Sequence, residues 1–240
     1  MLANLIHPSG GLKYHFRARR FQHSLWMPYL KQIDSWLSGL NVQKKNLMLI
    51  GASGGYTLPR SWLHSFQFIQ VIDPDPLAKF IFLKNIEHSN VSWDKKNYFV
   101  DINHFFRRLS QIPEDTFIVF CNFWGQIHFI YPDFVYSWPK NWETTILREL
   151  EKFNWASFHD IYSGVNLLPQ DVLIPKRPRP WSSLSDTSWL ETILPVDSQV
   201  TFHETPIFNI ASSDTFQYGT WQITPKQWQL IEFYFSGGLP

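Results

Sequence analysis

Short continuous apolar runs alternate along the chain with segments in which apolar residues recur every three or four positions. The runs cover residues 47–50, 68–72, 116–120 and 155–158. Runs of this length that stop at Gly, Asp or Cys are typical of strands buried on both faces. Helical spacing occurs over residues 77–86 and 143–153, and a helix is also expected around residues 105–109. This alternation predicts an α/β fold with a doubly wound, mostly parallel, Rossmann-like sheet.

The N-terminal and C-terminal segments on either side of this core have different sequence patterns. Helical spacing over residues 14–40 predicts an N-terminal helical segment, interrupted or kinked near Pro28 and closed by Gly39. A helix is also expected over residues 57–66, and a last short helix from Pro225. After Gly164 the chain is rich in proline, with a strand candidate at residues 205–210. We therefore expect one domain, in which residues 1–44 are a helical extension, 45–165 the cofactor-binding core, and 166–240 a proline-rich completion with C-terminal strands and a helix.

Composition narrows the class of protein. Hydrophobic residues make up 44% of the 240 residues and aromatics 18%, which is enough for a substantial core. The formal net charge of +1 gives no overall attraction to nucleic acid or to an anionic membrane, so any binding of a polyanion must be local. We favour a solvated helix face for Arg17–Arg20, and contact with nucleic acid through these residues is the alternative. With a single Cys, no signal peptide and no long apolar run, we expect a cytoplasmic protein without membrane contact.

The central motif is a strand that runs into a turn of small residues and then towards a helix. Leu47–Ile50 is followed by Gly51, Ala52, Ser53, Gly54, Gly55 and Tyr56. Small residues let the backbone take positive φ values and approach a ligand closely, and the N–H groups that follow can face an anion. Asp73 stands about 20 residues beyond Gly51, directly after the second apolar run, where an acid accepts hydrogen bonds from ribose hydroxyls. The alternative is a structural turn, with Asp73 capping a helix that starts near Pro76.

Over residues 45–165 these motifs resemble the class I S-adenosylmethionine-dependent methyltransferases. The resemblance implies that Gly51, Ala52, Ser53, Gly55 and Tyr56 surround the amino-acid portion of the cofactor, and that Asp73 and its neighbour Pro74 hold the ribose. It places Asp101 and Ile102 at the adenine, and Asn122 and Phe123 beside the transferred methyl group. The pattern is divergent. Leu49 replaces an acid of the first motif, Ser53 replaces a glycine, and Asn122-Phe123-Trp124 lacks the prolines of the amino-methylating motif.

Two other interpretations remain. Gly51–Gly55 also resembles the nucleotide loop of short-chain dehydrogenases, and Tyr136 and Lys140 have the Tyr-x-x-x-Lys spacing of that family. Thr57 in place of the last glycine, and Pro139 within the helix that would carry the pair, disfavour this NAD(P)-dependent alternative. A noncatalytic binding protein on a methyltransferase-like scaffold is the other alternative, because the acid of the first motif is missing.

Residues that could move a proton are few. Asn122, Tyr131, His159 and Asp160 are the candidates for catalysis, although such groups are more often hydrogen-bonded at strand ends. The histidine spacing predicts no metal site. Aromatic residues that could cover an apolar acceptor, or bind a protein partner, are Trp124, Tyr131, Phe134, Trp138 and Trp142. The acceptor of the methyl group, whether a small molecule or a protein, is not indicated.

Overall fold

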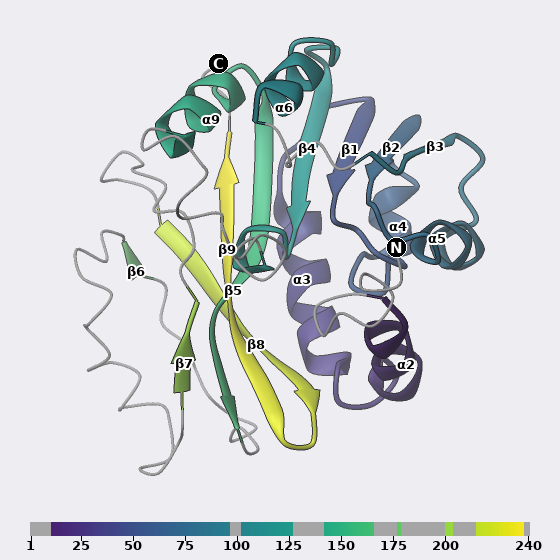
Figure 1. The fold of residues 1–240 in the computed structure, drawn as a ribbon, viewed down its shortest axis with the longest axis vertical. Helices are drawn as coiled ribbons and strands as arrows, with labels where there is room; N and C mark the ends of the chain where they lie inside the picture. The colour runs from purple at the N-terminus through teal and green to yellow at the C-terminus, as the bar shows by residue number, and fades with distance from the viewer. Residues whose placement is uncertain are drawn as a thin grey trace.

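The parallel half of the sheet is built from the apolar runs. The computed structural model describes residues 11–96, 102–126, 142–165, 177–178, 200–203 and 215–237. Its first five strands are β1 (Asn46–Ile50), β2 (Phe68–Ile72), β3 (Val91–Asp94), β4 (Thr116–Cys121) and β5 (Asn154–Val165). They lie in the order β3-β2-β1-β4-β5, and all four neighbouring pairs are parallel (Figure 1). Every residue of β4 is buried, as a continuous apolar run predicts.

Antiparallel strands extend the sheet beyond β5. The hairpin of β8 (Thr215–Thr224) and β9 (Gln227–Ser236) adds to it through β9, which pairs with the full length of β5. Two short strands complete the sheet: β6 (Arg177–Pro178) pairs with β8, and β7 (Val200–Phe202) pairs with the end of β5. The register of β5 against β9 shifts between Asp160 and Tyr162, which marks a bulge just beyond the parallel part of the strand.

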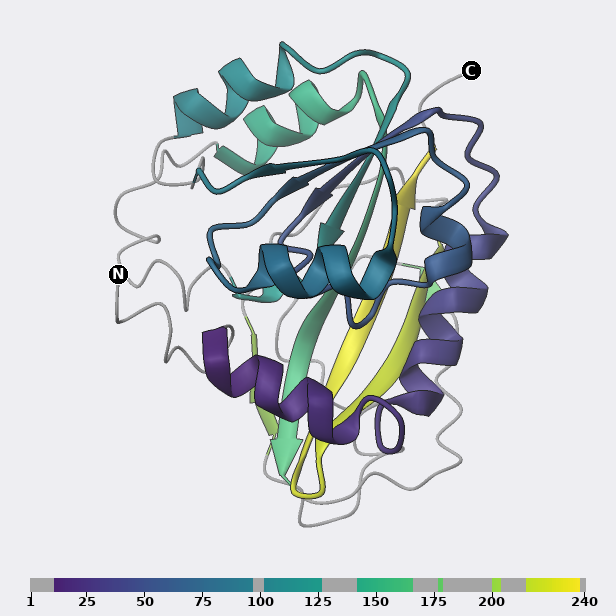
Figure 2. The ribbon, with the colours of Figure 1, turned by 90° about the vertical axis from the view of Figure 1, so that its right-hand side faces the viewer.

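Helices cover both faces of the sheet, which confirms the doubly wound architecture. On one face the core cluster joins residues of α3 (Met27–Gly39), α4 (Arg60–Leu63) and α5 (Ala78–Ile86) to side chains of β1, β2 and β4. On the other face α6 (Ile102–Leu109) and α9 (Trp142–Leu150) pack on alternate residues of the same strands. Figure 2 shows α6 and α9 on one side of the sheet and α5 on the other. The N-terminal α2 (Gly11–Phe21) lies beside α5 and contacts β8.

The N-terminal segment is interrupted before Pro28, as the sequence predicted: α2 ends at Phe21, and Pro28 occupies the first turn of α3, where its missing N–H costs nothing. Several other elements differ from the sequence-based prediction. The helix expected over residues 57–66 is a single turn, α4. The last helix, expected from Pro225, is absent from the described residues: Pro225 lies in the turn between β8 and β9, and the residues after it form β9. Because β9 is buried on both faces, its apolar residues also fit helical spacing. The expected strand at residues 205–210 lies outside the described residues.

Candidate functional site

The loops that follow β1, β2 and β4 meet at the carboxyl edge of the parallel sheet. The Gly51 N–H donates to the Ile72 carbonyl at 3.0 Å, which joins the end of β1 to the end of β2. Gly51 has φ +74, and a Cβ there would lie 3.3 Å from the Cys121 carbonyl oxygen and 3.7 Å from Phe123 Cβ. Chain order reverses between β1 and β4, and ligands of open α/β sheets bind at such a switch point.

Asp73 fastens the small-residue loop to the end of β2. Its Oδ2 accepts a hydrogen bond from the Ser53 N–H at 2.7 Å, and its Oδ1 accepts one from the Asp75 N–H at 2.9 Å. Asp73 is only 5% exposed. Burial raises the pKa of Asp73 to about 6, and the nearby Asp75 charge contributes in the same direction. The hydrogen bonds from the two backbone N–H groups lower this pKa and so limit the rise. The loop and the acid that the sequence singled out are therefore directly bonded to each other.

Ser53 has two unusual features. Its φ is +48, a left-handed conformation that explains why related motifs have glycine at this position. Its hydroxyl oxygen is inaccessible to solvent and has no hydrogen-bond partner among the described residues. A buried hydroxyl without a partner costs free energy, and a ligand group could pair with Ser53 Oγ once a shift of the loop exposes it.

The two glycines that end the loop are required by packing against α5. A Cβ on Gly54 would lie 2.7 Å from Ile81 Cγ2, and one on Gly55 would lie 2.9 Å from Phe82 Cδ2. Asn85 of α5 also donates to the Gly54 carbonyl at 2.9 Å. From the sequence, we inferred that small residues in this loop let the backbone approach a ligand closely. In the structure, Gly54 and Gly55 instead let the loop approach helix α5 closely.

Helix α2 is held against the loop through His15. The His15 ring nitrogens lie 3.0 Å from the Tyr56 hydroxyl and 3.0 Å from Asp75 Oδ2. Asp75 also accepts the Gly11 N–H at the first residue of α2. Burial alone would raise the pKa of Asp75, but the hydrogen bond from His15 and those from backbone N–H groups outweigh burial and lower it. Sequence reasoning missed His15 and Asp75, because they are 60 residues apart and match no motif.

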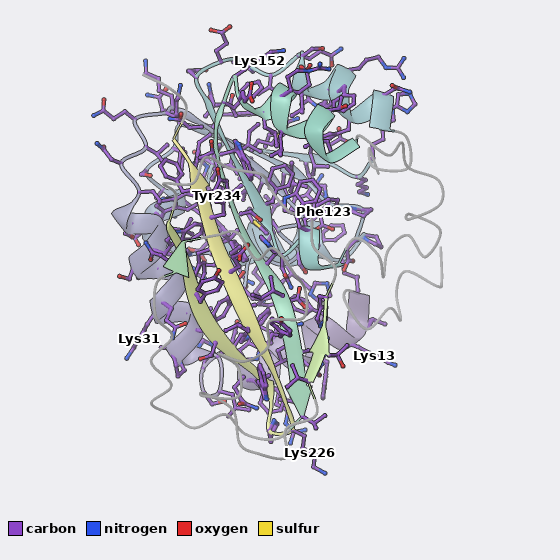
Figure 3. All side chains as sticks on the ribbon, turned by 90° about the vertical axis from the view of Figure 1, so that its left-hand side faces the viewer. Lys13, Lys31, Phe123, Lys152, Lys226 and Tyr234 are labelled. Carbon is purple, nitrogen blue, oxygen red and sulfur yellow. The ribbon has the colours of Figure 1, made fainter. Side chains whose placement is uncertain are left out.

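Asn122 and Phe123 stand at the end of β4, on the other side of Gly51. Asn122 takes φ +52, and its side-chain oxygen accepts the Asp160 N–H at 2.9 Å, which ties this loop to β5. Phe123 is 7% exposed and packs on Phe120 and Trp124. Figure 3 shows Phe123 among the interior side chains, away from surface residues such as Lys13 and Lys152.

His159 and Asp160 lie in a fully buried polar cluster around the end of the parallel part of β5. Both are 0% exposed. His159 is 2.9 Å from Ser157 Oγ through Nδ1 and 3.4 Å from Glu232 Oε1 through Nε2. Asp160 accepts a hydrogen bond from Gln229 at 2.5 Å. In this conformation neither side chain reaches solvent, so their observed role is to join β5 to β9.

The remaining sequence-predicted residues fall in different places. Ala52 is buried in the core and Pro74 is exposed. Ile102 begins α6, while Asp101 and Tyr131 lie outside the described residues. The acid that ends the third strand of the sheet is Asp94, whose carbonyl accepts the Asp73 N–H at 3.0 Å. Among the described residues, no three His, Cys, Asp or Glu side chains are placed to hold a metal ion.

Comparison with known proteins gives similarity only at the level of structure. No family model matches the sequence, and no curated protein matches it either. Magnesium protoporphyrin IX methyltransferase from Synechocystis PCC 6803, with bound SAH, has 10% identity and a TM-score of 0.42 over 91% of this chain and 94% of its own. The N-methyltransferase NodS from Bradyrhizobium japonicum has 14% identity and a TM-score of 0.33 over 54% of this chain and 65% of its own.

A SAM-dependent methyltransferase from Thiobacillus denitrificans, in complex with S-adenosyl-L-homocysteine, has 9% identity and a TM-score of 0.33 over 71% of this chain and 56% of its own. These proteins are methyltransferases, the class that the sequence motifs resemble. All three TM-scores are below 0.5, so the fold is assigned from strand order, strand register and the helices on both faces of the sheet.

Proposed function

We propose that this chain binds S-adenosylmethionine at the carboxyl edge of β1, β2 and β4 and transfers its methyl group to an acceptor. The observation that carries the proposal is the 2.7 Å hydrogen bond from the Ser53 N–H to Asp73, next to the switch point between β1 and β4. It brings the small-residue loop and a carboxylate together at the place where α/β sheets of this kind bind nucleoside-containing ligands.

The residues present fit such a cofactor. Each Asp73 oxygen accepts one backbone N–H, and a carboxylate oxygen can accept a second hydrogen bond, as a ribose hydroxyl would require. The Ser53 hydroxyl, buried and without a described partner, would bond a polar group of the cofactor's amino-acid portion. Ligand atoms at these two points would occupy hydrogen-bonding capacity that the described residues leave unused.

The strand order favours an adenosyl ligand over a dinucleotide. Dinucleotide-binding sheets continue beyond the fifth strand with a further parallel strand, which belongs to a second nucleotide-binding half. Here the strand beside β5 is β9, which is antiparallel and comes from a hairpin. Tyr136 and Lys140, the pair that suggested a dehydrogenase, lie outside the described residues.

The positions of the residues suggest a role for each of them in the proposed reaction. Bound S-adenosylmethionine would supply an electrophilic methyl group, and the protein's task is to align the acceptor with it and exclude water. The loop from Gly51 to Tyr56 and Asp73 would fix the cofactor. The His15–Tyr56 contact would hold α2 over that loop, while Asn122 and Phe123, beside Gly51, would border the acceptor.

Equilibrium titration with S-adenosylhomocysteine tests the proposal. We expect saturable, one-to-one binding by calorimetry near neutral pH, where Asp73 is ionised. Absence of saturation at millimolar ligand, in a sample with a cooperative thermal transition, would overturn the proposal. If the chain binds the ligand but transfers no labelled methyl group to any fraction of a cell extract, the noncatalytic alternative is favoured. The full burial of His159 and Asp160 is the observation that supports this alternative.

Replacing Ser53 with glycine should weaken S-adenosylhomocysteine binding by about tenfold, the value of one neutral hydrogen bond at its upper range. Glycine accepts the φ of +48 without strain, so the loop conformation should be kept. Ser53→Ala, which keeps the Cβ, should weaken binding equally, whereas Ser38→Ala on the exposed face of α3 should leave it unchanged. Unaltered affinity in both Ser53 variants would show that the hydroxyl does not contact the ligand.

A further inference from the structure

Helix α2 turns apolar and basic side chains towards solvent. Leu12 and Phe16 are 54% and 67% exposed, although residues of this kind usually face a core. The same face carries exposed Lys13, Arg19 and Arg20, and the helix contains no acid. Its fully buried residues are the small or polar Gly11, His15 and Ala18, and half-buried Tyr14 and Phe21 pack on the core beside them. Leu12 and Phe16 are therefore additional apolar residues, outside the side that packs on the protein.

Helix α5 repeats this pattern. Its buried side is Ala78, Phe82 and Ile86, which pack in the core. On the opposite side Phe80 is 70% exposed and Leu83 is 36% exposed. Exposed Lys84 lies beside them and half-buried Lys79 nearby, and the helix again contains no acid, the first being Glu87 at its carboxyl cap.

The two helices form one surface. His15 of α2 bonds Asp75, which lies just before α5 and whose side chain accepts the Leu77 N–H. Figures 1 and 2 both show α2 and α5 as neighbours on the same side of the molecule. We call this surface the α2–α5 face. Its apolar members are Leu12, Phe16, Phe80 and Leu83. Exposed apolar side chains with cations beside them, on two neighbouring helices, are typical of a contact site, because exposed apolar residues otherwise occur singly.

We propose that the α2–α5 face docks peripherally on an anionic lipid bilayer, with Leu12, Phe16, Phe80 and Leu83 entering the headgroup region and the surrounding lysines and arginines meeting lipid phosphates. Apolar side chains between cations, with no acids on the helices, are the pattern of interfacial membrane binding. A second copy of this chain would oppose cations to cations. A nucleic acid could stack bases on the two phenylalanines, but it would leave Leu12 and Leu83 without an apolar contact.

The rest of the molecule constrains how such docking would work. The net charge is +1, so the attraction to an anionic bilayer must come from this local surface. The proposal differs from the sequence-based expectation of no membrane contact. None of the helices in the described ranges has the length and hydropathy of a membrane span, which leaves surface attachment as the mode. Each basic residue near an anionic bilayer strengthens partitioning about fivefold, so reversing two charges should remove most of the binding.

Sedimentation of the full chain with lipid vesicles tests the proposal. We expect binding to phosphatidylcholine vesicles that contain about 30% phosphatidylserine, and little binding to pure phosphatidylcholine. The double variants Phe16→Ser/Phe80→Ser and Arg19→Glu/Arg20→Glu should each lower the partition coefficient at least tenfold. These side chains are exposed, so the fold should persist, which a thermal melt of each variant verifies.

Matched controls lie on other sides of the molecule. Phe68 is 41% exposed at the start of β2, and Phe68→Ser should leave vesicle binding unchanged. Lys31→Glu/Lys152→Glu reverses two exposed charges that Figure 3 shows far from Lys13, and should also have little effect. The proposal is overturned if anionic vesicles do not bind the chain, if neutral vesicles bind equally well, or if the controls lose as much binding as the face variants. Binding of single-stranded RNA that depends on Arg19 and Arg20 but not on Phe16 and Phe80, in the absence of vesicle binding, would assign the face to nucleic acid.

Discussion

Replacing Gly55 with valine should lower the free energy of unfolding by about 4 kcal/mol, the largest effect we expect from one substitution in the loop. Gly55 has φ +71, a conformation that a β-branched residue adopts only with strain. Its Cβ would also lie 2.9 Å from Phe82 Cδ2 and 3.2 Å from Ile86 Cδ1. Both residues are essentially fully buried, so neither can move aside cheaply. Equilibrium urea unfolding, followed by tryptophan fluorescence, measures the change.

Gly39 provides the matched control. It ends α3, has no positive φ, and a Cβ there would meet nothing within 4 Å. Gly39→Ala should therefore leave stability unchanged or raise it by up to about 1 kcal/mol through helix propensity. A loss below about 1 kcal/mol in Gly55→Val would show that the loop and α5 can separate, and would contradict the close packing described here.

The sequence predicted the strands that are rich in apolar residues. Residues 47–50, 68–72 and 116–120 are such segments, although Gln70 interrupts the second, and they became β1, β2 and β4 with bounds within one residue. The third strand, β3, escaped prediction because Val-Ser-Trp-Asp is short and half-buried throughout. Asp94 ends β3, while Asp101 and the residues 98–100 before it lie outside the described residues. A strand at the edge of a sheet has one neighbour, and therefore shows the weakest hydrophobic signal.

Local motifs predicted half of the candidate site. Ser53 and Asp73 were singled out by spacing, and the structure joins them by a hydrogen bond. The contacts of His15 with Tyr56 and Asp75 could not be read from sequence, because they depend on where α2 returns to the sheet. The same holds for the buried pairing of His159 with Glu232, which follows from the register of β5 against β9. Long-range pairings of this kind require the tertiary fold.

Replacing Asp73 with asparagine should remove a pH dependence of stability that the unaltered chain shows above about pH 4, although the amide can accept only one of the two backbone N–H groups that the carboxylate accepts. Asp73 is buried and its pKa is raised to about 6, chiefly by that burial. A carboxyl whose pKa is higher in the folded state stabilises the fold below its unfolded pKa, and this contribution is lost as the pH rises through about 6. Asparagine does not titrate. Relative to the variant, the unaltered chain should therefore lose about 3 kcal/mol between about pH 4 and pH 8, measured by urea unfolding across that range.

Burying an ionised carboxylate is costly, and Asp73 offsets part of that cost by accepting the Ser53 and Asp75 N–H groups; in the proposed function it also accepts the ribose hydroxyls. The Asp73→Asn variant should accordingly lose at least 100-fold in affinity for S-adenosylhomocysteine, since an amide presents one oxygen where two ribose hydroxyls need two acceptors. Asp34→Ala, on the exposed surface of α3, should change neither property. If Asp73→Asn lost the pH dependence of stability and kept its ligand affinity, Asp73 would have no part in the cofactor site. If it kept the pH dependence of the unaltered chain, the carboxylate would not be desolvated as described.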